Sequence, residues 1–259
     1  MLFNIAQIEV FTLMLVRVTA ALAAMPIFGH QALPKPLKVG LGFFLTLLLF
    51  GAAPHPLPAP SGAVIEIFFL ALKETVCGLL IGYATQGIFY AVEFGGAILG
   101  YQTGFSIVAS IDPMTQNQND VLARIQYVFV TLIFLSINGH HLFLSGLAGS
   151  FETIPLGMVH LDRSLMTWIV TMTTGISKTA VMLAAPVMVA LLLTDIGLGI
   201  LARVAPQMNI FVVGFPLKVG LVLLLMSGGM SAFAWLFVGH FGEFKNQFFV
   251  LLKLLSPVL

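Results

Sequence analysis

The chain has 259 residues, of which 59% are hydrophobic and only 8% are charged, and its mean hydropathy is +1.06. Soluble domains carry about 25% charged residues, so this composition excludes a soluble globular protein and predicts an integral membrane protein. The formal net charge of +1 argues against a nucleic-acid partner, which requires a basic surface. A single cysteine excludes an intrachain disulfide framework.

Two apolar helices are expected at the start of the chain. The first runs from Ile5 to Ile27 and is long enough to cross a bilayer of roughly 30 Å. The second runs from Leu37 to Ala53. The link between them, Gly29–Lys38, is basic and carries two prolines, which predicts a cytoplasmic loop. The proline-rich stretch at 54–60 has no Lys or Arg and predicts an extended connector on the opposite side.

Several charged residues interrupt apolar runs in the first half of the chain, among them Lys73-Glu74 in the run 63–111. Arg17 lies near the middle of the first helix, and Glu93 lies in the next apolar run. A charge inside such a run needs an opposite charge, water or backbone oxygens around it. Two interpretations stay open for each residue. A structural ion pair is favoured over a direct role in transport.

The apolar run at 63–111 contains glycines at a regular spacing. The run is too long for one membrane span and too short for two spans with a proper loop. Gly96, Gly100 and Gly104 follow one another at intervals of four residues, which places them on one helix face. Small residues on one face let a second helix approach closely. We therefore expect these three glycines to pack helices together.

The segment 106–120 is the most polar part of the chain. Asp112-Pro113 is a turn signal, and a run of uncharged amide side chains follows it. The residue pattern alone favours an exposed linker, with a constriction or plug inside a channel as the alternative. The candidate plug residues are Ser106, Ile107, Val108, Ala109, Ser110, Ile111, Asp112, Pro113, Met114, Thr115, Gln116 and Asn117.

Further helices are expected in the second half. A helix at Val121–Leu135 is followed by an amphipathic stretch, Gly149–Arg163, which is expected to be an interfacial loop. The apolar run Ser164–Leu201 contains a proline, which predicts a bent helix or a helical hairpin. The last apolar run is Asn209–Phe241, and the tail Gly242–Leu259 carries lysines that favour the cytoplasmic side.

The stretch from Asp195 to Gly220 combines residues that are costly inside lipid. An apolar run with one acid ends in a basic turn that contains proline, and a second apolar run then holds glycine, proline and lysine. Such residues must be surrounded by protein or water. The residues concerned are Asp195, Arg203, Pro206, Gln207, Asn209, Gly214, Pro216 and Lys218.

No pattern in the sequence predicts a catalytic residue, a cofactor site or a metal site. The motifs G-x-S-x-G and H-E-x-x-H are absent, and Ser136 with His140 is the only local pair of nucleophile and base. His140 and His141 are adjacent, so on a helix they point about 100° apart and do not suit one metal ion. The broken, glycine-rich segments 78–104 and 197–220 are alike in kind, which keeps a secondary transporter of a small solute as an alternative.

The stretch 203–218 resembles the signature of the FliR family of flagellar biosynthetic proteins, which also includes the equivalent subunit of virulence type III secretion systems. The matching residues are Arg203, Pro206, Gln207, Asn209, Phe211, Gly214, Phe215, Pro216 and Lys218. Arg17 and Lys38 also agree, as does the run Gly95–Phe105 that leads to Asp112-Pro113. The sequence PQMNIFVVGFP at residues 206–216 is more similar to flagellar than to virulence members of the family.

The resemblance implies a non-enzymatic core subunit of a protein export gate. It implies an all-α membrane protein whose long, kinked helices and helical hairpins pack into a hetero-oligomeric complex, with the whole chain, 1–259, as one domain. The implied partners are FliP, FliQ and FlhB, together with membrane lipid and the unfolded flagellar proteins that pass through the gate. Partner helices would surround the charges that lipid cannot accommodate.

The resemblance also implies a location and a role for the polar segment. The location is the bacterial inner membrane at the flagellar basal body, with several passes through the membrane; the lysines of the tail, Lys245 and Lys253, predict a cytoplasmic C-terminus. The position of 106–120 matches the pore-closing loop of the family. With the resemblance, the plug interpretation is favoured over the linker.

Overall fold

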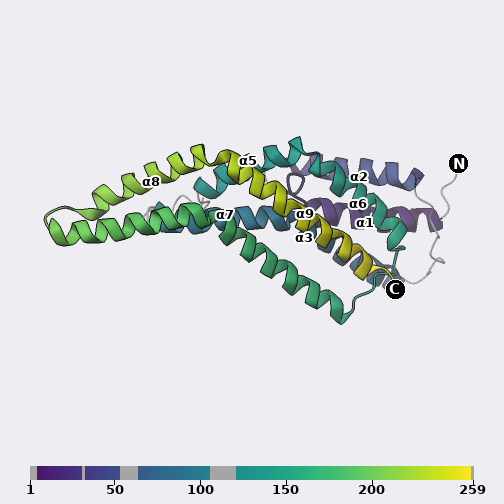
Figure 1. The fold of residues 1–259 in the computed structure, drawn as a ribbon. Coiled ribbons are helices and arrows are strands. Elements are labelled where there is room, and N and C mark those ends of the chain that lie inside the picture. Colours follow the sequence, from purple (N-terminus) through teal and green to yellow (C-terminus); the bar gives the residue numbers. More distant parts are fainter. Residues whose placement is uncertain (1–4, 31–32, 53–63, 106–120, 258–259) are drawn as a thin grey trace. The chain divides into compact units, whose positions relative to one another are not determined.

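The chain is folded into α-helices. The computed structural model describes residues 5–30, 33–52, 64–105 and 121–257, and these ranges contain eight helices and no β-strand (Figure 1). The predicted all-α membrane fold is confirmed in these ranges. The helices are α1 (Ile5–Ala24), α2 (Lys35–Ala52), α3 (Val64–Thr103), α5 (Val121–Ser136), α6 (Gly139–Thr153), α7 (Arg163–Val204), α8 (Ile210–Gly228) and α9 (Met230–Leu255).

The helices form two compact units, each with its own core. Unit 1 comprises Met1–Gly87, Phe134–Thr173 and Glu243–Leu259, and unit 2 comprises Ile88–Ile133 and Thr174–Gly242. The units are therefore built from interleaved parts of the chain. Each contains segments that are far apart in the sequence.

Aromatic and aliphatic side chains fill the two cores. In unit 1, the ring of Phe143 lies 5.6 Å from that of Phe134 and 5.5 Å from that of Phe248, which joins α5, α6 and α9. Unit 2 has an aliphatic core drawn from α3, α5, α7 and α8. Its buried members are Leu99, Leu122, Ala184, Leu191 and Val222.

Several helices meet the length and composition that membrane crossing requires. Within the described residues, Ala6–Ala24 and Arg163–Val204 each qualify alone. Two bent pairs, Val121–Ser136 with Gly139–Thr153 and Val212–Gly228 with Met230–Leu255, qualify when each pair is taken together. Long apolar helices are what the composition predicted.

The two longest apolar runs each form one continuous helix. α3 has 40 residues, and α7 has 42 residues with Pro186 inside it. The alternative of a helical hairpin within 164–201 is therefore wrong. The bent-helix alternative agrees with a proline inside one helix, because a proline removes one hydrogen bond without ending a helix that tertiary contacts support.

Three predicted boundaries need correction. α1 ends at Ala24 rather than at Ile27, because Pro26 follows and Ile27 has a φ of 70°. The expected loop Gly149–Arg163 is shorter, because α6 continues to Thr153. Burial of Phe151 and Ile154 in unit 1 accounts for the extra helical turn. The last apolar run was expected to end at Phe241, whereas α9 continues to Leu255.

Two breaks have a local cause. Asn138 has a φ of 55° between α5 and α6, a conformation that asparagine tolerates better than most residues. The 66° bend between α8 and α9 lies at Gly229. A Cβ atom there would lie 2.7 Å from the carbonyl oxygen of Leu225, so only glycine fits without a shift.

Candidate functional site

An ion pair joins the two arms of the α7–α8 hairpin. Lys218 on α8 pairs with Asp195 on α7 through Nζ and Oδ1. The lysine side chain is 17% exposed and the aspartate side chain is 45% exposed, so the pair lies at the edge of unit 2. Figure 1 shows the C-terminal half of α7 and α8 running side by side. Asp195 and Lys218, two charges that are costly inside lipid, are therefore paired with each other within the hairpin.

The same lysine holds the C-terminal end of α3. Lys218 Nζ donates to the carbonyl oxygen of Gln102 at 3.3 Å, one residue before the helix ends at Thr103. The last carbonyls of a helix have no partner in the helix and carry partial negative charge, so a cation is favourable there. Gly104, the next residue, has a φ of 92°, which is the usual conformation of a glycine that ends a helix.

Two more contacts fix this end of α3 within unit 2. Gln102 Nε2 donates to the carbonyl oxygen of Met188 on α7 at 3.1 Å. The ring of Phe105 packs edge-on against Phe215 of α8, with centroids 5.5 Å apart. The α7–α8 hairpin therefore holds the chain at the point where segment 106–120 begins.

A cavity of about 550 Å³ lies at this junction. It contains both members of the ion pair and reaches the end of α3. Its lining residues are Thr103, Gly104, Asp195, Leu198, Gly199, Ile210, Val212, Gly214, Phe215 and Lys218. We take this cluster, the α3–α7–α8 junction, as the candidate functional site.

The chemistry of the α3–α7–α8 junction suits anchoring. Its charged groups are one carboxylate and one ammonium, already paired, and the rest of the lining is apolar apart from Thr103. Across the described residues, no three His, Cys, Asp or Glu side chains are placed to hold a metal ion. What the arrangement provides is a fixed position for a helix end.

The predicted motif residues divide between the junction and the hairpin turn. Asp195, Gly214 and Lys218 line the cavity. Gly214 is buried, and a Cβ there would lie 3.0 Å from Leu198 Cδ1, so glycine permits close approach of α7 and α8. The other motif residues are exposed and do not line the cavity. These are Arg203, Pro206, Gln207, Asn209 and Pro216.

The turn itself lies where the sequence placed it. α7 ends at Val204 and α8 begins at Ile210, and the Pro206-Gln207 turn lies between them. The carbonyl oxygen of Asn209 accepts hydrogen bonds from the amides of Val212 and Val213, at 3.1 and 3.3 Å, which begins α8.

The three spaced glycines, two in α3 and one directly after it, have different surroundings. A Cβ on Gly96 would lie 2.5 Å from Ala123 Cα, so this glycine lies directly against α5. Gly100 is buried. Gly104 lies one residue beyond the end of α3 with a positive φ, and a Cβ there would lie 3.7 Å from Phe215 Cδ2 of α8. The positive φ of Gly104 gives a reason for a glycine at this helix end.

Arg17 lies outside this junction, in the core of unit 1. Its Nε donates to Glu74 Oε2 at 2.5 Å, and neither side chain is exposed. Its Nη1 donates to the carbonyl oxygens of Ser150 and Ile154, at 3.1 and 2.9 Å, where α6 ends. Its guanidinium also lies 4.6 Å from the ring centre of Phe151. Of the two interpretations of Arg17, the structure shows the ion pair.

Glu74 extends this cluster to the connector after α6. Its second oxygen, Oε1, accepts a hydrogen bond from the amide of Gly157 at 2.7 Å. Glu93, in unit 2, interacts electrostatically with Arg124 on α5 and is only partly buried. The candidate plug residues, 106–117, and the proline-rich stretch, 54–60, lie outside the described residues.

Sequence reasoning missed the partners of these charges. Nothing in the spacing marks Glu74, 57 positions from Arg17, as its partner. Gln102 belongs to the resembling run, but no pattern predicts that it contacts Lys218, which is 116 positions away. Either partner can be found only from the tertiary fold. The fold brings one part of α3 against α1 and another part against the hairpin.

The fold and the junction define an all-α membrane protein with no recognisable catalytic or metal centre in its described part. Residues 8–244 match the family described as "Bacterial export proteins, family 1", and the chain belongs to that family. The match covers all of unit 2 and most of unit 1.

Relatives with a flagellar name cover most of the chain. The chain is 35% identical over 234 residues to the flagellar biosynthetic protein FliR of Escherichia coli (strain K12), covering 90% of this chain and 88% of that protein. It is 34% identical over 225 residues to FliR of Bacillus subtilis (strain 168), covering 85% and 86%. These matches support a membrane-embedded export component of flagellar biosynthesis and agree with the resemblance found in the sequence.

Proposed function

We propose that this chain is a core subunit of the flagellar type III protein export gate. Together with partner subunits it forms the channel through which unfolded flagellar proteins cross the bacterial inner membrane. The chain acts as one non-enzymatic gate domain, its partners are FliP, FliQ and FlhB, and its C-terminus is cytoplasmic. The α3–α7–α8 junction is the observation that carries this proposal.

The junction supports a gate subunit because it anchors the segment that a gate needs to control. Lys218 and Gln102 hold the end of α3, directly before 106–120. In this proposal, residues 106–117 are the plug of the channel and close it when no substrate passes. A plug requires a firm attachment point, and a helix end bound by a charged side chain supplies one.

The hairpin also offers surface for partners. Large apolar residues on α7 and α8 are exposed in the chain alone. Among them, Val204 is 76% exposed, and Val212 and Leu224 are each 66% exposed. Large apolar side chains that are this exposed in the chain alone are expected to contact lipid or other proteins. The Asp195–Lys218 pair keeps the hairpin free of unpaired charge at this position, which suits insertion between apolar helices.

Co-purification after mild detergent extraction tests the proposal. The chain carries an affinity tag in its native bacterium, and the bound proteins are identified by mass spectrometry. We expect a stable complex with FliP and FliQ, and we expect the chain alone to show little transport activity. A solitary chain that transports a small solute in vesicles would reject the gate and support the carrier alternative. Association only with virulence secretion subunits would reject the flagellar assignment.

A further inference from the structure

The break between α8 and α9 leaves backbone groups outside both helices. The last bond of α8 runs from the amide of Gly229 to the carbonyl oxygen of Leu225, at 2.8 Å. The first bond of α9 runs from the amide of Phe233 to the carbonyl oxygen of Gly229, at 2.9 Å. The carbonyls of residues 226–228 and the amides of residues 230–232 therefore stand outside the two helical ladders. Such groups at a helix end need partners from side chains, water or ligands.

A cavity of about 570 Å³ lies at this break, within unit 2. Its walls come from α5, α7, α8 and α9, and Gly228 and Gly229 are among the residues that line it. A glycine has no side chain, so these two present backbone atoms to the cavity. The hydroxyl of Ser227 donates to the carbonyl oxygen of Leu224 at 2.9 Å and is already satisfied. The cavity thus combines largely apolar walls with open backbone groups at the break.

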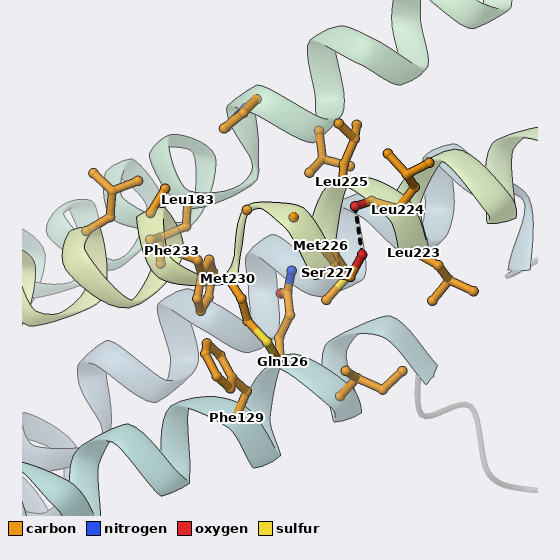
Figure 2. A pocket seen from close by; sticks show the side chains of 17 residues that line it. Gln126, Phe129, Leu183, Leu223, Leu224, Leu225, Met226, Ser227, Met230 and Phe233 are labelled. Atoms are coloured by element: carbon orange, nitrogen blue, oxygen red, sulfur yellow. Dashed lines mark hydrogen bonds between the residues drawn. The ribbon is translucent and has the colours of Figure 1, made fainter.

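Gln126 on α5 directs an unpaired amide into the same cavity. The residue is only 6% exposed, and its amide has no hydrogen bond within the described part of the chain. Figure 2 shows the amide nitrogen pointing toward the break, with Ser227 and Met230 on either side. The amide oxygen faces α3, because a Cβ on Gly96 would lie 2.8 Å from Gln126 Oε1. Burying an amide without a hydrogen bond costs free energy, so the amide needs a polar partner in the cavity.

We infer that ordered water molecules occupy the break and bridge the Gln126 amide to the open backbone groups of α8 and α9. A water site needs two to four polar partners and room of about 30 Å³ per molecule. The cavity exceeds that volume many times. The side-chain amide, the carbonyls at the end of α8 and the amides at the start of α9 supply the partners. Water can reach these groups whether lipid or a partner helix covers the mouth of the cavity.

This inference goes beyond the export function. It concerns the inside of unit 2, and it holds or fails whichever protein the channel carries. The bent pair α8–α9 is long and apolar enough to cross a membrane, and irregular backbone in such a span occurs where it is buried in protein or lines water. Bridging water molecules would replace the helical bonds that are missing at the break and so support the bend.

X-ray radiolysis of the full chain in lipid nanodiscs tests the inference. Hydroxyl radicals form from water and oxidise the nearest side chains, methionine among the fastest, and mass spectrometry maps the products. Met226 lines the cavity and Met188 does not, and both are partly buried residues packed against the same core of unit 2. We expect Met226 to be oxidised several-fold faster than Met188. Equal rates would show that lipid or protein fills the cavity and would overturn the inference.

A matched pair of variants tests what holds the water. Gln126→Leu keeps nearly the same volume but removes the amide, and we expect it to lower the oxidation rate of Met226 several-fold while that of Met188 stays the same. Gln86→Leu is the control, because Gln86 lies in unit 1 and does not line the cavity. An unchanged rate in Gln126→Leu, or an equal fall in both variants, would contradict the inference. The comparison of Met226 with Met188 in the unaltered chain stands even if a variant folds poorly.

Discussion

Arg17 Nε and Glu74 Oε2 lie 2.5 Å apart with no exposed side-chain surface, although 57 positions separate the two residues. The pair ties α1 to α3, and its remaining hydrogen bonds reach the end of α6 and the connector after it. An arginine that cannot lose its charge is thus surrounded by one carboxylate and two carbonyl oxygens. The contact therefore links α1, α3 and α6 within unit 1.

Breaking the pair should unfold unit 1. Arg17→Met leaves Glu74 as a buried carboxylate without a counter-charge, and removing one partner of a buried ion pair costs about 3–5 kcal/mol. We expect a large loss of folded protein and a clear fall in the midpoint of thermal unfolding in detergent. Lys178→Met is the control, because Lys178 is exposed.

The double variant Arg17→Met with Glu74→Leu separates charge from packing. Replacing both partners removes the unpaired charge, so the loss should be smaller than the sum of the two single losses. Additive losses would show that the two residues contribute independently and that the ion pair is not the reason for their burial.

Lys218→Leu should weaken both the α3 anchor and assembly. The substitution removes the contact with Gln102 O and leaves Asp195 without its partner. Hydrogen bonds to charged groups contribute about 1.5–3 kcal/mol, and the partial exposure of this site places the loss toward the lower end. We expect less co-purified FliP and FliQ and reduced motility. Unchanged assembly and motility would reject a role for Lys218.

Exchanging the two charges distinguishes the ion pair from the helix anchor. Asp195→Lys combined with Lys218→Asp restores opposite charges across the hairpin. It also places a carboxylate beside the C-terminal carbonyls of α3, where a negative charge is unfavourable. We expect assembly to remain impaired. Full rescue by the exchange would mean that only the ion pair matters.

Shortening the polar segment should open the channel. Deletion of residues 108–115 removes most of the proposed plug. We expect increased leakage of ions and small molecules across the membrane of cells that carry the complex. Co-purification must first show that the complex is intact. An intact complex that does not leak would count against the plug.

Gly96→Ala should destabilise unit 2. The added Cβ would lie 2.5 Å from Ala123 Cα on α5, and such overpacking costs about 1–3 kcal/mol. Gly197→Ala on α7 is the matched control, because its Cβ meets nothing within 4 Å in the described chain. That change should stabilise the helix by up to about 1 kcal/mol. Chemical denaturation in detergent measures both.

A local signal in the sequence predicted one helix end well, because the proline turn at Pro206 lies between α7 and α8 as expected. Pro26 ends α1 by the same backbone chemistry, although the first helix was expected to continue to Ile27. Local signals did not predict that α3 continues without a break over 40 residues. Its run contains Lys73, Glu74 and Glu93, and charges in an apolar run suggest a break until a partner is known.

For the functional residues too, the sequence predicted some features, whereas others depend on the tertiary fold. An arginine in an apolar helix predicts that a partner exists, yet only the tertiary fold selects Glu74 rather than Glu93. Regular glycine spacing predicts close contact, and Gly96 lies against α5. Gly104 has the same spacing but follows the last residue of α3. The same glycine spacing therefore has different consequences within a helix and beyond its end.

The length of α7 exceeds what a bilayer can cover. Its 42 residues extend over roughly 63 Å at 1.5 Å per residue. Even at a tilt of about 40°, the largest usually observed, it spans roughly 48 Å along the membrane normal, against about 30 Å of hydrocarbon. Exposed apolar side chains occur along the whole helix, at Val170, Val181, Leu193 and Ile200. In the proposed gate, roughly a third of α7 therefore lies outside the lipid, where the surface of a partner protein would keep its apolar side chains from water.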